Sequence, residues 1–173
     1  MGYRVTAVGH IDVRPALNDE EFEYLMAFAE SRRWRRSSDL WAVPSSPFGM
    51  DDEYDEVEAY NDPPAGQPGL WCPWVPACEG RCLVVRDAHD GKHYGLTRWL
   101  AYLDETFLRR GARAQGAAGF DAFTFDHELG GVVAAHRSDS GEMWLVRPRA
   151  GRVEEEVLRQ GDSLAEQIAY EEG

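Results

Sequence analysis

The sequence predicts an α+β fold, a two-layer sandwich in which two main helices pack on one antiparallel sheet. Residues 3–14 alternate between apolar and polar side chains, which is the period of a half-buried strand. Two later segments, one after Asn18 and one after His93, repeat apolar residues at the spacing of a helix. The resulting order of strand, helix, strand, strand and helix, followed by a β-meander, is ferredoxin-like.

The first helix has a clear start signal. Asn18 is the expected N-cap, and Glu21 three residues later predicts a capping box. The apolar residues expected to face the sheet are Phe22, Leu25, Met26 and Ala29. A helix with this single apolar stripe is expected to pack on the sheet through one side only.

The middle of the chain predicts a strand pair and the main packing helix. We expect a strand over Leu70–Val75, a turn at Glu79 and Gly80, and a returning strand over Arg81–Asp87. The second helix is expected over Tyr94–Arg110. Its apolar stripe consists of Leu96, Trp99, Leu100, Leu103 and Phe107. Gly111 is placed as the left-handed residue that ends this helix.

Short strands are predicted in the last third of the chain. Alternation over Phe120–Asp126 predicts one strand, which Gly130 and Gly131 should interrupt. Val132–His136 and Met143–Arg147 then predict a hairpin.

The domain organisation follows from these elements. We expect one domain over residues 1–150, with an irregular acidic insertion at 37–68. Residues 151–173 are expected to form an acidic tail, in which Ser163 begins a short C-terminal helix.

Composition limits the partners and the compartment. The formal net charge is -13, which opposes general nucleic-acid binding. The acidic residues are expected mainly to keep the surface solvated, with a basic protein partner as the alternative. No apolar run approaches 18 residues and the first strand begins at once, so we expect neither a membrane span nor a signal peptide. Three cysteines, an odd number, favour a reducing cytoplasm over a disulfide framework.

Two cysteines and two histidines have a spacing that raises the question of a metal. Cys78, Cys82, His89 and His93 supply thiolates and imidazoles, the ligands that zinc prefers, although the pairs are closer together than in a zinc finger. A turn between Cys78 and Cys82 could instead allow a redox-labile bridge, or leave two free thiols. We expect no cofactor, with zinc as the alternative, and we expect Cys72 to be a small buried residue.

A histidine and carboxylate site is a second hypothesis. His10 lies on the polar face of the first strand, and His127 and Glu128 lie at the end of another. If these strands pair, the side chains could meet and support acid–base chemistry as a small hydrolase. The alternative is a polar face in contact with solvent.

The run Arg32–Arg36 suggests a third hypothesis, since arginine binds phosphate and Trp34 could stack on a base. That would make the protein a nucleotide or RNA binder. The same arginines could pair with the acidic run at residues 51–62.

The leading prediction is a non-enzymatic protein-binding module of the inhibitor, immunity or anti-defence type. Aromatic side chains are common contact residues in protein interfaces. The residues expected to form this surface are Trp41, Tyr54, Tyr60, Trp71 and Trp74. No catalytic signature motif occurs in the sequence.

One stretch carries a family resemblance. The run G-Q-P-G-L-W-C-P-W-V-P at residues 66–76, together with W-L-x-Y-L-x-x-x-F-L at 99–108, resembles a family of small uncharacterised proteins from actinobacteria, other bacteria and their phages. The resemblance covers roughly residues 3–147. It implies a bacterial or phage origin and carries no assigned activity or functional residue.

Overall fold

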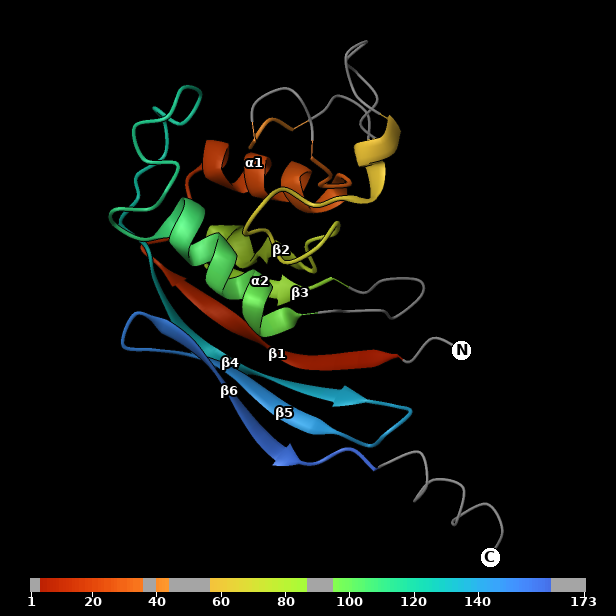
Figure 1. The fold of residues 1–173 in the computed structure, drawn as a ribbon. Coiled ribbons are helices and arrows are strands. Elements are labelled where there is room, and N and C mark those ends of the chain that lie inside the picture. The colour runs from red at the N-terminus through yellow and green to blue at the C-terminus, as the bar shows by residue number, and fades with distance from the viewer. Residues whose placement is uncertain (1–3, 36–39, 44–56, 87–94, 163–173) are drawn as a thin grey trace, which may run out of the picture.

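One antiparallel sheet of six strands organises the part of the chain that the computed structural model describes, namely residues 4–35, 40–43, 57–86 and 95–162. The strands lie in the order β2-β3-β1-β4-β5-β6, and two helices lie on one face of the sheet (Figure 1). The elements are β1 (Val5–Arg14), α1 (Asp19–Glu30), β2 (Trp74–Ala77), β3 (Cys82–Val85), α2 (Leu96–Leu103), β4 (Glu128–Arg137), β5 (Met143–Arg149) and β6 (Arg152–Arg159). The predicted α+β class and the predicted order of the first five elements are confirmed.

Helix α1 begins at the predicted capping box. The Asn18 side chain accepts a hydrogen bond from the Glu21 N–H at 2.8 Å, and the Glu21 carboxylate accepts one from the Asn18 N–H at 2.8 Å. Leu25 and Ala29 are buried as expected. Phe28, which the predicted stripe omitted, is also fully buried.

Helix α2 buries the whole predicted stripe from Leu96 to Phe107. The regular helix is shorter than predicted, because its last turn widens into a π-helical turn over Asp104–Leu108. Gly111 then has a φ of +75°, the left-handed conformation expected after the helix.

The first strand of the predicted hairpin starts later than expected. Residues 70–73 are not part of a strand, and β2 begins at Trp74. The Leu70 carbonyl accepts a hydrogen bond from the Arg33 N–H at 2.7 Å instead of joining the sheet. Beyond Trp74 the predicted hairpin forms, with Ala77 opposite Cys82.

The predicted strand at Phe120–Asp126 is wrong. This segment forms turns, with Phe120 and Phe125 buried among other aromatic rings. The Thr124 N–H donates to the Glu21 carboxylate at 2.6 Å. The backbone of this segment therefore bonds to a side chain and not to a neighbouring strand. Phe125 has a φ of +50°, a left-handed conformation that a residue other than glycine rarely adopts and that does not continue an extended strand.

The predicted break at Gly130 and Gly131 is also wrong, because β4 runs through both glycines. A Cβ at Gly131 would lie 2.9 Å from the His10 carbonyl oxygen, and one at Gly9 would lie 2.7 Å from the Val132 carbonyl oxygen. Glycine on both strands therefore allows β1 and β4 to approach closely.

The sheet also extends into the predicted acidic tail. Residues Arg152–Arg159 form β6, which pairs with β5 and makes one edge of the sheet. The expected C-terminal helix lies outside the described residues, as does much of the acidic insertion. Of that insertion, Val57–Asn61 forms a short 3-10 helix.

Candidate functional site

The two faces of the sheet have different surroundings. Helices α1 and α2 cover one face, where Ile11, Val13 and Val133 are buried (Figure 1). The opposite side, which we call the open face, carries no helix from the described ranges (Figure 1). Because side chains alternate along a strand, the residues between the buried ones point to the open face.

Apolar side chains from three neighbouring strands meet on the open face. Val8 of β1 is opposite Ala134 of β4, and Ala134 is opposite Leu145 of β5. Val132 and Met143 lie on the same face beside this row. Their exposure is unusual, since Val8 is 75%, Val132 40% and Met143 39% exposed. We call Val8, Val132, Ala134, Met143 and Leu145 the open-face patch.

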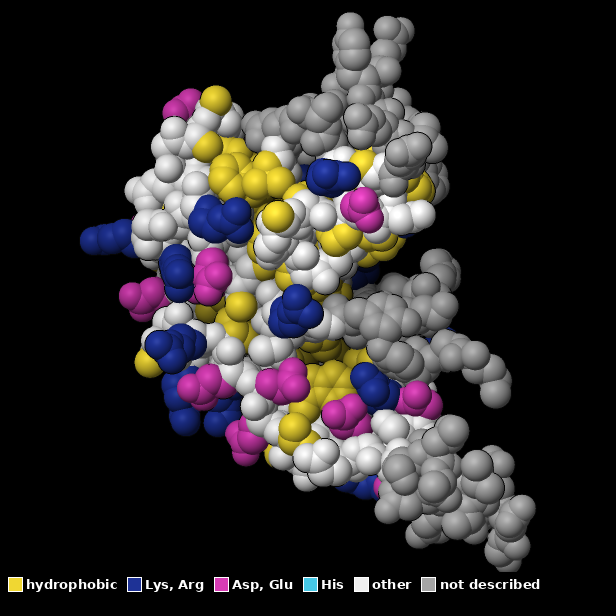
Figure 2. Space-filling model, viewed as in Figure 1, with side chains coloured by type: hydrophobic (Ala, Val, Ile, Leu, Met, Phe, Trp, Pro, Cys, Tyr) yellow, Lys and Arg dark blue, Asp and Glu magenta, His cyan; other side chains and the backbone are white. Residues whose placement is uncertain are grey.

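Polar and charged side chains surround the open-face patch. The His10 imidazole lies 3.2 Å from the Asp12 carboxylate beside Val132, and Arg147 and Glu156 form an ion pair at 3.9 Å beside Leu145. An apolar centre with a polar rim is the usual anatomy of a protein interface. From the side of the helices, acidic side chains are seen to gather over the part of the molecule formed by β5 and β6 (Figure 2).

The predicted aromatic binding residues do not form one surface. Trp74 is only 1% exposed and donates its indole N–H to the Leu96 carbonyl at 2.9 Å, so its predicted exposure is wrong. Trp41 packs edge-on against Phe107 and Phe120.

The remaining aromatic candidates have different surroundings. Tyr60 packs on Trp34 and lies under the Arg32 guanidinium. Trp71 is 40% exposed and stays a candidate contact residue, whereas Tyr54 lies outside the described residues.

The catalytic candidates do not converge. Strands β1 and β4 do pair, but His10 is opposite Val132 on the open face. His127 is buried next to α1, with its ring 3.1 Å from the Glu21 carboxylate. Glu128 is opposite Arg14 and exposed. The hypothesis that His10 meets His127 and Glu128 is therefore wrong.

His127 instead joins a buried polar cluster. Its Nδ1 lies 2.7 Å from the Pro15 carbonyl oxygen, and its Nε2 lies 3.1 Å from both Glu21 Oε2 and Thr124 Oγ1. Burial alone would raise the pKa of Glu21, but hydrogen bonds from His127, Thr124 and Asn18 outweigh it and lower the pKa to about 2. Burial would lower the pKa of His127, yet Glu21 and Pro15 hold it above its usual range.

The cluster has a structural role. Both ring nitrogens and both carboxylate oxygens already have partners, and the two side chains are each 1% exposed. The cluster ties α1 to the β1–α1 connection and to the turns before β4. Sequence reasoning recognised Glu21 only as a capping residue, since a capping box uses one of its carboxylate oxygens and leaves no signal for the other.

A pocket of about 350 Å³ lies where the π-helical turn meets the β5–β6 turn. Its walls include Asp104, Arg109, Glu128 and Arg152, and part of His127. The Asp104 carboxylate is 3.9 Å from the Arg109 guanidinium. Burial raises the pKa of Asp104 to about 6, because it outweighs the attraction of Arg109. The pocket is large enough for a small polar molecule. Its other acid–base group with a shifted pKa, His127, already uses both ring nitrogens within the buried cluster.

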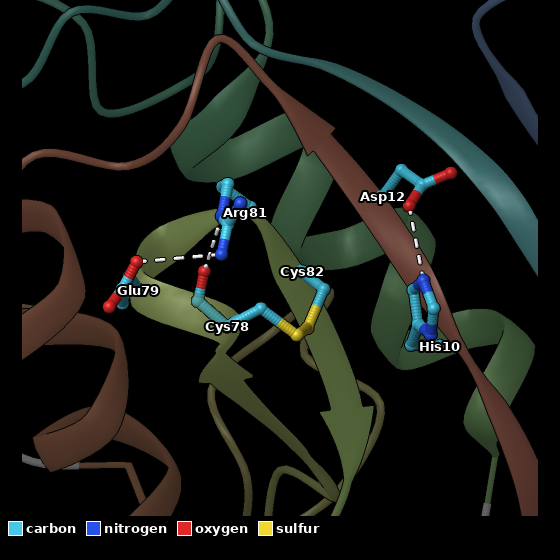
Figure 3. The surroundings of a disulfide bond; sticks show 6 residues. All are labelled: His10, Asp12, Cys78, Glu79, Arg81 and Cys82. Carbon is cyan, nitrogen blue, oxygen red and sulfur yellow. Dashed lines mark hydrogen bonds and ion pairs between the residues drawn. A yellow bond between two sulfur atoms is a disulfide. The ribbon is translucent and has the colours of Figure 1, made fainter.

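Cys78 and Cys82 form a disulfide across the β2–β3 turn (Figure 3). The two sulfur atoms that the zinc hypothesis required as thiolates are therefore bonded to each other. His89 and His93 lie outside the described residues. Within the described ranges, no cluster of three or more histidine, cysteine or acidic residues could hold a metal. Cys72 is a buried free thiol, as expected.

The described arginines of the run 32–36 bind other segments of the same chain. Arg33 is buried and donates to the Ala42 carbonyl at 2.8 Å, and Arg32 donates to Asn61 at 2.8 Å. Arg35 forms an ion pair with Asp62 at 3.6 Å, which confirms pairing with the acidic run. Arg36 lies outside the described residues.

The comparisons with known proteins supply no function for this chain. No protein-family model matches the chain, and no curated protein or solved structure is significantly similar to it. The resemblance to a bacterial and phage family stays a prediction. In the described part of the chain, no helix is long and apolar enough to cross a bilayer.

Proposed function

We propose that the protein is a non-enzymatic binding module that holds a protein partner on its open face. The observation that carries this proposal is the row of Val8, Ala134 and Leu145, which crosses three strands and leaves Val8 75% exposed. The solvated face of an antiparallel sheet is normally polar. A contiguous apolar group with a polar rim is typical of an interaction surface.

The net charge of the chain indicates what charge the partner surface would carry. The net charge is -13, and Glu154 and Glu156 of β6 lie at the side of the open-face patch. Acidic surfaces accelerate association with basic ones by steering, and they disfavour acidic partners. We therefore propose a partner surface with an apolar centre and basic residues around it, as an inhibitor or immunity protein would require.

The test replaces Val8 by aspartate. A charge at the centre of an interface core is strongly unfavourable, while an exposed strand position tolerates it in the folded protein. Val157→Asp is a matched control, because Val157 is a 44% exposed valine of β6 that lies opposite the buried Trp144, on the face of the sheet that carries the helices. Affinity capture from a bacterial lysate should retain one polypeptide on the wild type and on V157D, and lose it on V8D. Equal capture by all three proteins would reject the open face as the binding surface.

Self-association is the other possible use of this face. Light scattering coupled to size exclusion distinguishes the two, since a symmetric dimer through the patch would dissociate in V8D and persist in V157D. A monomeric wild type that still loses its captured polypeptide in V8D supports the proposal. A patch-dependent dimer that captures nothing contradicts it.

A further inference from the structure

The β2–β3 turn holds a disulfide with one accessible end. Cys78 and Cys82 are four residues apart with their Cα atoms 5.5 Å from each other. Cys78 is exposed at the turn, whereas Cys82 begins β3 and is buried. We therefore expect an attacking thiolate to approach the disulfide from the Cys78 side.

The backbone of this turn is strained. Cys78 and Glu79 have φ values of +53° and +54°, a conformation that costs residues other than glycine about 1 kcal/mol or more each. Arg81 holds the turn closed, since its N–H and its Nε donate to the Cys78 carbonyl at 3.1 and 3.0 Å (Figure 3). The disulfide closes the same turn covalently, so breaking it allows both residues to relax.

The turn also supports the end of β1. The Val13 N–H donates to the Arg81 carbonyl at 2.9 Å, and the Leu17 N–H donates to the Gly80 carbonyl at 2.9 Å. A Cβ at Gly80 would lie 2.6 Å from the Leu17 carbonyl oxygen, which shows how closely the two segments pack. A change in the turn is therefore transmitted to the β1–α1 connection.

We propose that Cys78 is a thiol–disulfide exchange site, through which a dithiol reductant opens the Cys78–Cys82 bond and releases the turn from the β1–α1 connection. One thiolate of the reductant attacks the Cys78 sulfur, so that a new disulfide forms there and Cys82 leaves as a thiolate that takes a proton from water. The second thiolate of the reductant then attacks the reductant sulfur that is bonded to Cys78. This step closes a disulfide within the reductant and releases Cys78 as a thiolate. The reductant loses two electrons and the protein gains them.

The third cysteine provides an internal standard for reactivity. Cys72 is fully buried, and burial raises the pKa of its thiol to about 12. Since the thiolate is the reactive form, Cys72 should remain unmodified in the folded protein. Cys78 has the opposite surroundings, because it is exposed at the turn.

The chemical test compares two single variants. In C82S the remaining Cys78 should react with iodoacetamide at least about tenfold faster than Cys82 does in C78S, as judged by peptide mass spectrometry. The wild-type disulfide should also be reduced by dithiothreitol without denaturant, while Cys72 stays unmodified. Equal alkylation of the two variants, or reduction that requires unfolding, would overturn the proposal.

Hydrogen exchange tests the structural consequence. On reduction, the amides of Val13 and Leu17 should exchange at least about tenfold faster, because their acceptors lie in the released turn. The Phe22 amide, which donates to the Asn18 carbonyl at 2.9 Å in the first turn of α1, should keep its rate and serves as the control. Unchanged exchange at Val13 and Leu17, or faster exchange at all three, would rule out a local release.

Discussion

Glu21 and His127 form a buried ion pair, with 3.1 Å between the carboxylate and the imidazole, although the two residues are 106 positions apart in the sequence. Each member also bonds to a third segment, Glu21 to Thr124 and His127 to Pro15. The pair is a buried polar link between α1 and the segment that leads into β4. It therefore offers the most direct tests of the fold.

Removing the charge of Glu21 should destabilise the protein. Breaking one partner of a buried ion pair costs about 3–5 kcal/mol, so Glu21→Gln should lower the free energy of unfolding by that amount. For a chain of this length, the midpoint of thermal unfolding should fall by roughly 10 °C. Glu20→Gln is the matched control, because Glu20 is exposed on the same helical turn. Similar unfolding curves for the two variants would show that the pair does not stabilise the protein.

The same pair should make stability depend on pH. The pKa of His127 is raised above 6.5, so its contribution is complete below that pH and is lost as the pH rises through the raised pKa. The pKa of Glu21 is lowered to about 2, so its contribution is complete above pH 4.5 and is lost as the pH falls toward 2. Urea unfolding should therefore show the largest difference between wild type and E21Q between pH 4.5 and 6.5. A difference that grows steadily toward alkaline pH would contradict this.

The ionisation of Asp104 should change stability in the opposite direction to the ionisation of Glu21. Because burial raises its pKa to about 6, the folded state binds a proton more tightly than the unfolded state, and stability is lost as the pH rises through 6. Asp104→Asn should therefore stabilise the protein at pH 8 by on the order of 1–3 kcal/mol and have little effect at pH 4. Glu105→Gln, on the exposed side of the same turn, should change stability by less than about 0.5 kcal/mol. A stabilisation of D104N that is equal at both pH values would mean that ionisation is not its cause.

Two adjacent glycines in β4 should differ in their tolerance of a methyl group. Gly131 has a φ of +81° and a Cβ there would lie 2.9 Å from the His10 carbonyl oxygen. Gly131→Ala should therefore cost roughly 1–3 kcal/mol in the free energy of unfolding. A Cβ at Gly130 would lie 3.9 Å from Asp12, an ordinary contact, so Gly130→Ala should change stability by less than about 0.5 kcal/mol. Equal costs would show that β1 and β4 can separate to admit the methyl group.

Local patterns predicted most of the fold. The alternation that predicted the first strand, the capping box at Asn18 and the apolar stripe from Leu96 to Phe107 each depend on neighbouring residues. The structure confirms the strand over Val5–Arg14, the capping box and the burial of the stripe. The errors occur where long-range contacts override local preference. Phe120–Asp126 alternates like a strand, but its aromatic side chains fill the core beside Tyr24 and its backbone bonds to Glu21.

The candidate sites also combine features that local sequence predicted with features that depend on long-range contacts. Residue types and spacing identified His127, Glu128 and the Cys78–Cys82 turn as candidates for chemistry, and the acidic composition left a solvated surface and a basic partner as alternatives. The partners of those residues depend on strand register, which places His10 on the open face and turns His127 toward α1. The open-face patch had no signal in the sequence, because its members come from three strands and become neighbours only when β1, β4 and β5 pair. Local chemistry is encoded within a few residues, whereas burial and side-chain partnership are set by contacts between segments that the chain keeps far apart.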